Sequence, residues 1–467
     1  MVFSSPTFLF IFLPAVFLLN LLFRRKLLWS NALLIVASLV FYAWGEPVYV
    51  LLMIGTTFVC WLLARLMERY KGHRKLFCAL AAVWGVGTLV FFKYTDFLLE
   101  NFNALTGLAV PLPGIVLPVG ISFFTFQATS YVFDVYRGDA KVADSYFDVL
   151  LYISLFPQLI AGPIVRYADI AAQVRERSVS IAHVAAGFRR FCFGLAKKAL
   201  IANTLAFTAD AVYALPRNGV NAPIAWLGAI AYLLQIYFDF SGYSDMAIGL
   251  GEAFGFHFLE NFTYPYAAVS MQDFWRRWHI SLSTWFREYV YIPLGGNRKG
   301  KLRTGVNKLI VFLLTGLWHG ASWSFAAWGL YHGGFLMMES YGVIKPDRWP
   351  KILRRVYMLL VVTVGFVIFR ADTLGDGFFM IGRMLAGWSF TPALSAQLSL
   401  LLSPLCVAAL AAGVLASSPF AHETGARIVA RRAGFAYGIY AAAFMLLVLS
   451  ALCVATSSYN PFIYFRF

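Results

Sequence analysis

The stretch "FWRRWHISLSTWFREYVYIPLGGNRKG", residues 274–300, interrupts a chain whose other long segments are apolar. It holds five Lys/Arg residues, three tryptophans and one histidine. Of the 467 residues in the chain, 60% are hydrophobic and only 13% are charged. Apolar segments long enough to cross a bilayer recur along the whole length, without the alternation of barrel strands. The composition therefore predicts an all-α polytopic membrane protein, in which this basic stretch is the exception.

The charge of the chain is strongly positive, with 38 Lys+Arg against 22 Asp+Glu. Most basic residues lie between apolar segments, as the positive-inside rule expects, so the excess indicates topology and not nucleic-acid binding. The five cysteines lie in apolar segments without C-x-x-C spacing, so neither a disulfide framework nor a metal site is expected. The first basic cluster, Arg24 to Lys26, follows the first apolar run. This order predicts a retained first helix with its N-terminus outside.

Threading the chain by its basic clusters predicts about ten crossings plus shorter buried or re-entrant helices, in one membrane domain over residues 1–467. The piece "YISLFPQLIAGP", residues 152–163, has two prolines and a glycine and is predicted to be re-entrant or interfacial. Residues 271–308 carry eight Lys/Arg and two acids and are predicted to be a cytoplasmic amphipathic segment. The tail, residues 457–467, is predicted to lie on the outer side.

The basic segment also has an aromatic face if it is helical. Trp275, His279, Leu282 and Phe286 would share one side of a continuous helix, while the arginines lie largely on the other. This pattern predicts that His279 is buried among aromatic rings and that the arginines meet water or phosphates. The alternative is an interfacial amphipathic helix with snorkelling arginines.

A second histidine lies in "GLWHGASW", residues 316–323. An ionisable group such as His319 at membrane depth is a functional candidate, and a neutral imidazole can accept a proton near neutral pH. Its small neighbours, Gly320 to Ser322, are expected to leave room for a substrate. The alternative is a core histidine bonded to a backbone carbonyl. His332 has the same features and a weaker claim.

Two acids lie in the apolar stretch "YFDFSGYSDMAIGLG", residues 237–251. Asp239 and Asp245 could orient a histidine, pair with an arginine, line a polar tunnel or form a purely structural pair. The chain has no G-x-S-x-G, Walker A, G-x-G-x-x-G, H-E-x-x-H or H-x4-D pattern. A histidine acting as base without an internal Ser or Cys nucleophile remains.

The motifs "FDFSGYSDMAIGLG", "ENFTYPY", "GLWHGASW" and the stretch at 274–300 together resemble the membrane-bound O-acyltransferase family, in its bacterial alginate O-acetyltransferase-like branch. The similarity runs from "MVFSSPTFLF" through "LIAGPIVRY" and "VIFRA" to "YNPFIYFRF". The resemblance implies a helical fold with a central tunnel. It implies His319 as the central family histidine and His279 as the second active-site histidine. The tail also fits the F-x-Y-x-x-F pattern of such acylation systems, as Phe462, Tyr464 and Phe467.

The topology and the resemblance together predict a mechanism. Acetyl-CoA approaches from the cytoplasm as donor substrate, with no bound cofactor and no metal. His319 takes the proton of an acceptor hydroxyl, while His279 positions the thioester or stabilises the oxyanion. Tyr464 could receive acetyl and pass it on, or it is an aromatic-belt residue. The residues expected to bind substrate are Arg276, Arg277, Arg298, Lys299, Arg303, Asp239, Asp245, Trp275 and Trp318.

The predicted function is a multi-pass O-acetyltransferase of the bacterial inner membrane, surrounded by lipid, with both termini periplasmic. It would serve O-acetylation of an exopolysaccharide, alginate-like or cellulose, with a periplasmic SGNH-type esterase-like partner implied by the resemblance. One alternative is a peptidoglycan or teichoic-acid O-acyltransferase of the same family. A different class, a transporter or flippase whose buried His and Asp residues relay protons, is the remaining alternative.

Overall fold

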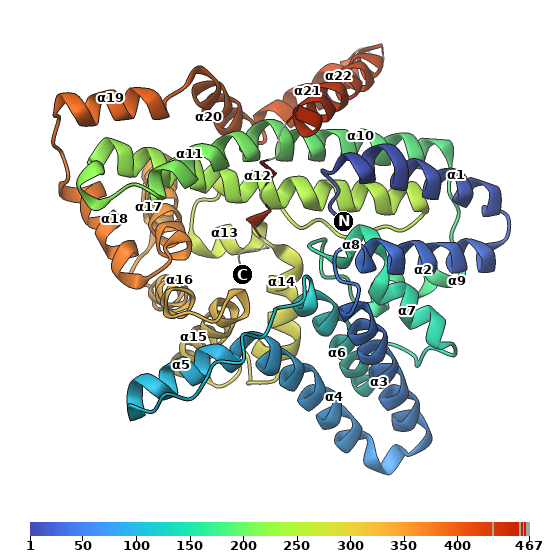
Figure 1. Cartoon of the computed structure of the whole chain (residues 1–467). Helices are drawn as coiled ribbons and strands as arrows, with labels where there is room; N and C mark the ends of the chain where they lie inside the picture. The colour runs from blue at the N-terminus through green and yellow to red at the C-terminus, as the bar shows by residue number, and fades with distance from the viewer. Residues whose placement is uncertain (432–433, 457–458, 461, 464–467) are drawn as a thin grey trace. The chain divides into compact units, whose positions relative to one another are not determined.

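The computed structural model describes residues 1–431, 434–456, 459–460 and 462–463. Every regular element in these ranges is a helix (Figure 1), so the predicted all-α fold is confirmed for the described residues. The chain divides into two compact units. Unit 1 comprises Met1–Phe191 with Ser244–Leu259, and unit 2 comprises Cys192–Tyr243 with Glu260–Phe467. That the whole chain forms a single membrane domain stays a prediction.

Unit 1 is built from the N-terminal helices of the chain and receives the end of α12. Its α-helices are α1 Leu13–Phe23, α2 Leu27–Ala43, α3 Tyr49–Arg69, α4 Arg74–Leu89, α5 Thr95–Thr106, α6 Ile121–Arg137, α7 Tyr146–Ser154, α8 Phe156–Leu159, α9 Tyr167–Arg175 and most of α10 Ile181–Ala196. The piece predicted to be re-entrant is not one helix: α7 ends at Ser154 and the buried four-residue α8 begins at Phe156. The amide of Phe156 donates to Ser38 Oγ at 3.0 Å, which satisfies one backbone donor at this break.

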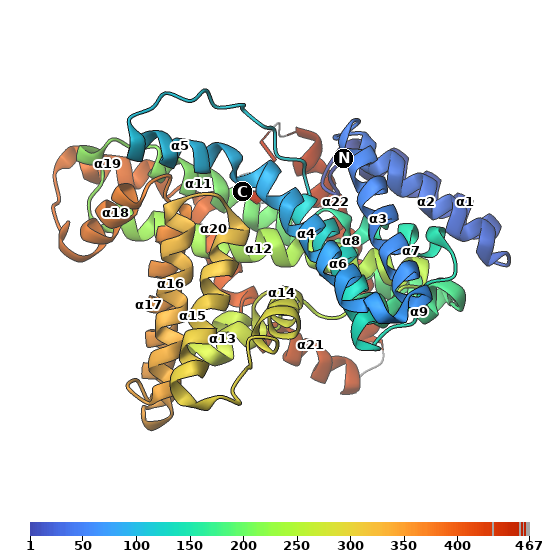
Figure 2. The ribbon, with the colours of Figure 1, turned by 90° about the horizontal axis from the view of Figure 1, so that it is seen from below.

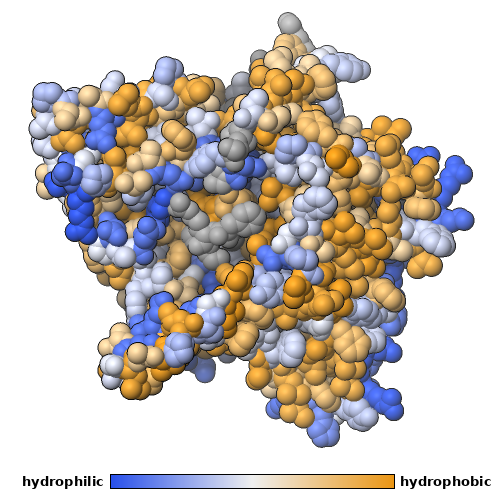
Figure 3. All heavy atoms as spheres, in the orientation of Figure 1, coloured by the Kyte–Doolittle hydropathy of each residue, from blue (hydrophilic) through white to orange (hydrophobic). Residues whose placement is uncertain are grey.

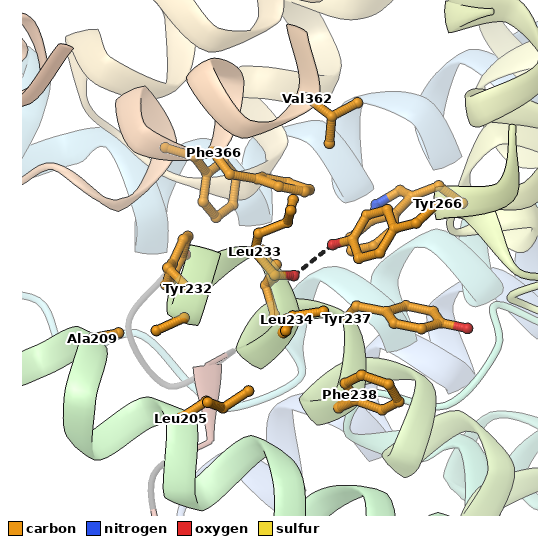
Figure 4. Close-up of a cluster of buried hydrophobic side chains, with 14 of the residues drawn as sticks. Leu205, Ala209, Tyr232, Leu233, Leu234, Tyr237, Phe238, Tyr266, Val362 and Phe366 are labelled. Atoms are coloured by element: carbon orange, nitrogen blue, oxygen red, sulfur yellow. Dashed lines mark hydrogen bonds between the residues drawn. The ribbon is translucent and has the colours of Figure 1, made fainter. Parts of the chain in front are cut away.

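Unit 2 contains the remaining helices. They are α11 Asn203–Tyr213, most of α12 Ala222–Phe254, α13 Met271–Arg277, α14 Ile280–Phe286, α15 Gly300–His319, α16 Trp323–Tyr341, α17 Lys351–Arg370, α18 Leu374–Ala386, α19 Pro392–Leu401, α20 Pro404–Ala416, α21 Phe420–Arg431 and α22 Phe435–Thr456. The core of this unit lies around α12 and α17 (Figure 4). There Tyr266 satisfies its buried hydroxyl by donating to Leu233 O at 2.5 Å.

Five helices of the described residues are long and apolar enough to cross a membrane. They are Tyr49–Arg69, Lys71–Thr106, Ala222–Phe254, Lys351–Arg370 and Tyr437–Thr456. A sixth candidate is the pair α19 and α20, which is bent by 63°. The visible surface over α3 and α4 is mostly apolar, with hydrophilic residues near the loop that joins them (Figure 3). The chain is therefore a multi-pass membrane protein, although the described helices support fewer crossings than the ten predicted.

Helices α15 and α16 form a tightly packed hairpin, with α17 beside α16 (Figure 2). A Cβ atom on Gly316 would lie 2.2 Å from the carbonyl oxygen of Phe325, and one on Gly329 would lie 2.3 Å from that of Phe312. No real side chain tolerates such distances, so both positions require glycine. This close approach of the two backbones fixes the turn between the helices, and His319 is the last residue before that turn.

Candidate active site

His279 lies at a break between two short helices, and the single continuous helix predicted for this segment is wrong. Helix α13 ends at Arg277 and α14 begins at Ile280. The backbone of His279 has φ 44° and ψ 55°, a left-handed conformation that a non-glycine residue rarely adopts. Such strain costs about 1–3 kcal/mol and persists only where the surroundings enforce it, most often at functional sites. The prediction that His279 is buried is nevertheless confirmed, at 1% exposure.

Asn261 enforces this conformation from the "ENFTYPY" segment. Its backbone carbonyl accepts from the Ile280 amide at 3.0 Å. Its side-chain Oδ1 accepts from the amide and the hydroxyl of Ser281, at 3.2 and 2.9 Å. The same Oδ1 lies 3.3 Å from His279 Nδ1, and because an amide oxygen only accepts, Nδ1 carries the proton. Asn261 therefore fixes both the orientation and the tautomer of the imidazole.

Burial also fixes the charge of His279. Loss of solvation lowers its pKa to about 3, so the ring is neutral at physiological pH. The unfolded chain binds a proton as pH falls through about 6.5, whereas the folded chain does not until about 3. The contribution of His279 to stability is therefore present above pH 6.5 and is lost as pH falls from there toward 3.

We expect His279→Gln to reduce the pH dependence of stability. Between pH 7.5 and 5, the melting temperature of the detergent-solubilised parent protein should fall further than that of the variant, because only the parent holds this imidazole neutral. Thermal denaturation of both proteins at the two pH values measures the difference. Equal losses in the two proteins would contradict the assignment of a neutral, desolvated ring.

His319 lies in an aromatic enclosure made by three helices of unit 2. Its ring centroid is 4.8 Å from Trp318 of α15, 5.3 Å from Trp328 of α16 and 5.0 Å from Phe369 of α17. The residue is 9% exposed. The helix ends there because Gly320 is extended and Ser322 caps α16 by accepting from the Phe325 amide at 3.4 Å. The imidazole is thus positioned by the helix end and by the rings around it.

The expectation that small neighbours leave room for a substrate is wrong at Gly320. A Cβ atom there would lie 2.1 Å from the ring of Phe325, so the missing side chain makes space for that ring. His332 is fully buried beside Trp275 and Trp328, at ring distances of 5.2 and 5.0 Å. Within the described residues, neither of its ring nitrogens has a hydrogen-bond partner. Trp275 thereby joins the basic segment to the α15–α16 hairpin.

Trp318 links the two histidines that the sequence singled out. Its ring lies 6.0 Å from that of His279 and 4.8 Å from that of His319. The two imidazoles therefore cannot be further apart than the sum of those distances, although they are forty residues apart in sequence. Phe240 of α12 closes the His279 side at 4.6 Å. Two histidines in one buried aromatic site could take part in acid–base or oxyanion chemistry.

Asp239 contacts the C-terminal segment of the chain. Its Oδ1 lies 2.6 Å from Lys198 Nζ, with only 2% and 4% of the two side chains exposed. Its Oδ2 accepts from the Ile463 amide at 2.8 Å. Lys198 Nζ lies 5.7 Å from the Phe462 ring, and Tyr243 packs on that ring at 5.0 Å. The buried ion pair thus holds residues 462–463 by one backbone contact and one ring contact, and Tyr243 adds a second ring contact.

A second ion pair, between Asp210 and Arg370, holds the same C-terminal segment a few residues earlier, at Tyr459. Tyr459 donates its hydroxyl to Asp210 Oδ2 at 2.6 Å, and Asp210 Oδ1 accepts from Arg370 at 2.6 Å. Asn203 also donates to the side chain of Asn460 at 3.3 Å. We call Lys198, Asp239, Asp210 and Arg370 the tail anchor. Tyr464 and Phe467 lie outside the described residues.

The remaining predicted substrate-binding residues are more dispersed. Asp245 pairs with Arg190 at 2.8 Å within unit 1, which is one of the predicted alternatives. Arg277 pairs with Asp273 at 2.8 Å and is half-buried. Four of the predicted basic residues are exposed: Arg276, Arg298, Lys299 and Arg303. Their exposure leaves them accessible to a charged molecule in water.

Sequence reasoning missed Asn261, Lys198, Asp210 and Arg370 as contributors to these sites. Asn261 and Arg370 lie inside the quoted motifs "ENFTYPY" and "VIFRA", so the motifs marked the segments but not the residues' roles. Lys198 lies in the π-helical turn Lys197–Ala202 that continues α10 into α11, where it is buried. The available signal was the pair Lys197–Lys198 inside an otherwise apolar stretch.

Comparison of the sequence with known proteins shows the family to which the chain belongs. The model of the membrane-bound O-acyltransferase family, MBOAT, matches residues 142–368, a range that includes both histidines, Lys198, Asp239 and Asn261. The chain is 40% identical over 509 aligned residues to a probable alginate O-acetylase of Azotobacter vinelandii, with 100% of both chains covered. The chain therefore belongs to the membrane-bound O-acyltransferase family, and it is a membrane acyltransferase.

Two further relatives are named for other substrates. The chain is 36% identical over 410 residues to the peptidoglycan O-acetyltransferase of Helicobacter pylori, with 80% of this chain and 78% of the relative covered. It is 28% identical over 272 residues to the teichoic acid D-alanyltransferase of Bacillus subtilis, with 54% and 68% covered. The full-length similarity is thus to O-acetylases of polysaccharides.

Proposed function

We propose that this protein transfers acetyl groups from cytoplasmic acetyl-CoA across the bacterial inner membrane for O-acetylation of an exopolysaccharide. The observation that carries the proposal is the buried site in which Trp318 contacts both His279 and His319. Full-length similarity to a probable alginate O-acetylase supports acetyl as the group and an alginate-like polymer as the acceptor. The proposal includes about ten crossings, a central tunnel and periplasmic termini.

The two histidines have different tasks in this proposal. His319 accepts the proton of the attacking hydroxyl as the oxygen bonds to the thioester carbonyl, and the thiolate of CoA leaves and is protonated. His279 is neutral and its Nδ1 is committed to Asn261, so Nε2 is the nitrogen that would meet the thioester. A pKa of about 3 makes His279 a poor proton acceptor, which favours a positioning role for it.

Arg276, Arg298, Lys299 and Arg303 are proposed to bind the phosphates of CoA, while the acetyl-pantetheine arm enters the tunnel. Guanidinium groups suit this task because they bind phosphate oxygens with paired hydrogen bonds. Arg276 is the best single candidate, since it is exposed and lies one residue after Trp275, which packs toward His332.

We expect Arg276→Glu to raise the KM for acetyl-CoA about 5- to 50-fold with little change in kcat, because it replaces a phosphate contact by a repulsive charge. Initial rates of CoA release in proteoliposomes measure both constants. Arg287→Glu is the matched control, because Arg287 is exposed but already pairs with Glu288 at 2.7 Å. An unchanged KM with reduced expression would instead indicate that Arg276 serves membrane topology.

The acceptor side of the proposal uses the C-terminal tail. Tyr464 would receive acetyl as a phenol ester and a periplasmic SGNH-type partner would move it to the polymer. The tail anchor supports this step, because it holds Tyr459 and Ile463, which precede Tyr464 in the chain. A polysaccharide chain would then never have to enter the narrow site.

Donor specificity tests the proposal against its alternatives. The purified protein in proteoliposomes is supplied either with acetyl-CoA or with an acylated carrier protein. Thioester cleavage with acetyl-CoA alone supports the proposed donor. Cleavage of the carrier thioester alone would favour a function like that of the teichoic acid relative, and solute flux without any thioester would favour a transporter.

A further inference from the structure

A cluster of two histidines and a glutamate lies in unit 1, apart from the residues used above. His183 belongs to α10, Glu252 to the last turn of α12, and His257 follows that helix. Glu252 Oε2 lies 2.7 Å from His257 Nδ1, and its Oε1 lies 4.0 Å from His183 Nε2. One potential ligand atom from each of the three residues lies within 4.8 Å of the others.

The backbone around this cluster is tightly defined. A Cβ atom on Gly187 would lie 2.4 Å from the carbonyl oxygen of Gly249, and one on Gly249 would lie 2.4 Å from that of Gly187. This reciprocal contact presses α10 against α12, which lie side by side (Figure 1). His183 is one turn before Gly187 and Glu252 is nearly one turn after Gly249, so both side chains lie next to the fixed contact.

His257 is held by separate interactions. Gly255, with φ 84°, ends α12 and reverses the chain. The amide of His257 then donates to Gln173 Oε1 of α9 at 2.8 Å. The His183 and His257 rings meet edge to face with centroids 5.5 Å apart. His183 Nδ1 is buried and has no hydrogen-bond partner among the described residues, so the approach of Nε2 to Glu252 leaves this imidazole incompletely satisfied.

From this geometry we infer that His183, Glu252 and His257 form a site for a transition-metal dication, with zinc as the best fit. Two imidazole nitrogens and one carboxylate oxygen are a ligand set that zinc accepts at about 2.0–2.2 Å, with a water in the fourth position. Tetrahedral ligand atoms would then be about 3.3 Å apart, so the three ligand atoms, which lie within 4.8 Å of one another here, would move closer on binding the ion.

The chemistry of the ligands also predicts which metal ions the site would select. Magnesium and calcium prefer oxygen ligands, whereas imidazole nitrogens favour zinc and its neighbours in the transition series. A bound ion would cross-link α10, the end of α12 and the following loop through three side chains. Its effect would be to stabilise unit 1, independently of acetyl transfer at the histidines of unit 2.

Metal binding by the full-length protein tests the inference. The affinity tag is removed, the protein is stripped with a chelator, and Zn²⁺ is titrated in competition with a chromophoric chelator. We expect one Zn²⁺ per chain with a Kd of micromolar or below, and no competition from millimolar Mg²⁺. His183→Ala and His257→Ala should each weaken binding at least tenfold. His73→Ala, which removes an exposed histidine elsewhere in unit 1, should not.

The melting temperature separates a metal site from a simple contact between Glu252 and His257. Zn²⁺ should raise the melting temperature of the parent protein and of His73→Ala, but not that of the double variant His183→Ala/His257→Ala. The inference is overturned if no saturable zinc binding occurs below about 100 μM. It is equally overturned if the double variant binds and is stabilised like the parent. Glu252 would then serve only as the partner of His257.

Discussion

His319→Ala should lose acetyl transfer almost completely while the protein still folds and inserts. A positioned general base contributes about 10²–10⁴-fold to rate, and no other residue of the aromatic enclosure around His319 can accept a proton. The loss should appear in kcat and in kcat/KM alike, because the proton transfer occurs only in the transition state. Initial rates of CoA release with purified parent and variant measure both.

A series of matched variants separates the loss of a catalytic base from the loss of side-chain packing. His319→Gln keeps most of the ring's volume and should be as inactive as His319→Ala, whereas His73→Ala changes an exposed histidine and should be fully active. Melting temperature and size-exclusion profile report whether each variant is folded. Turnover of His319→Gln within a few fold of the parent would show that this imidazole is a packing residue.

Removal of one partner of the buried Lys198–Asp239 pair should destabilise the protein severely. Both side chains are nearly inaccessible to water and 2.6 Å apart, so Asp239→Leu removes the carboxylate that pairs with the buried ammonium of Lys198. Breaking such a pair typically costs about 3–5 kcal/mol, whereas replacing both partners by apolar residues is often neutral. We therefore expect low yield and a strongly reduced melting temperature for Asp239→Leu, and recovery in Lys198→Met/Asp239→Leu.

The double variant then isolates the second role of Asp239. It removes the acceptor for the Ile463 amide and the cation near Phe462 while the protein stays folded. Carboxypeptidase should consequently digest the tail through residue 463 faster than in the parent protein. Asp376→Asn, which alters an exposed acid paired with Arg217, is the control. If the double variant remains as destabilised as the single one, or its tail is as protected as the parent's, the tail anchor is wrongly assigned.

The sequence predicted the membrane class and the all-helical fold because hydropathy and helical composition are local properties. It also predicted that His279 is buried, since aromatic residues surround it in the chain. It failed on the continuity of the 274–286 helix, because the break depends on Asn261, which reaches His279 through hydrogen bonds and not through periodicity. No propensity rule anticipates a left-handed histidine.

Contacts between residues far apart in the sequence account for the other differences between the predicted and the observed structure. The Lys198–Asp239 pair joins positions on two helices, so neither charge could be matched to its partner from spacing. The space beside Gly320 is filled by Phe325, which only the hairpin geometry brings there. The His183–Glu252–His257 cluster combines residues about seventy positions apart, which is why metal-ligand spacing patterns along the chain missed it. Such features require the packed structure.

The most direct test of the account is mass spectrometry of the C-terminal peptide after incubation of purified protein with acetyl-CoA. We expect acetyl on Tyr464 in the parent protein and none in His319→Ala. This result would support acetyl-CoA as the donor, His319 as the base and Tyr464 as the relay. An unmodified Tyr464 despite His319-dependent CoA release would contradict the relay and indicate direct transfer to an external hydroxyl. Absence of CoA release from the parent protein would contradict acetyl-CoA as the donor and with it the central claim.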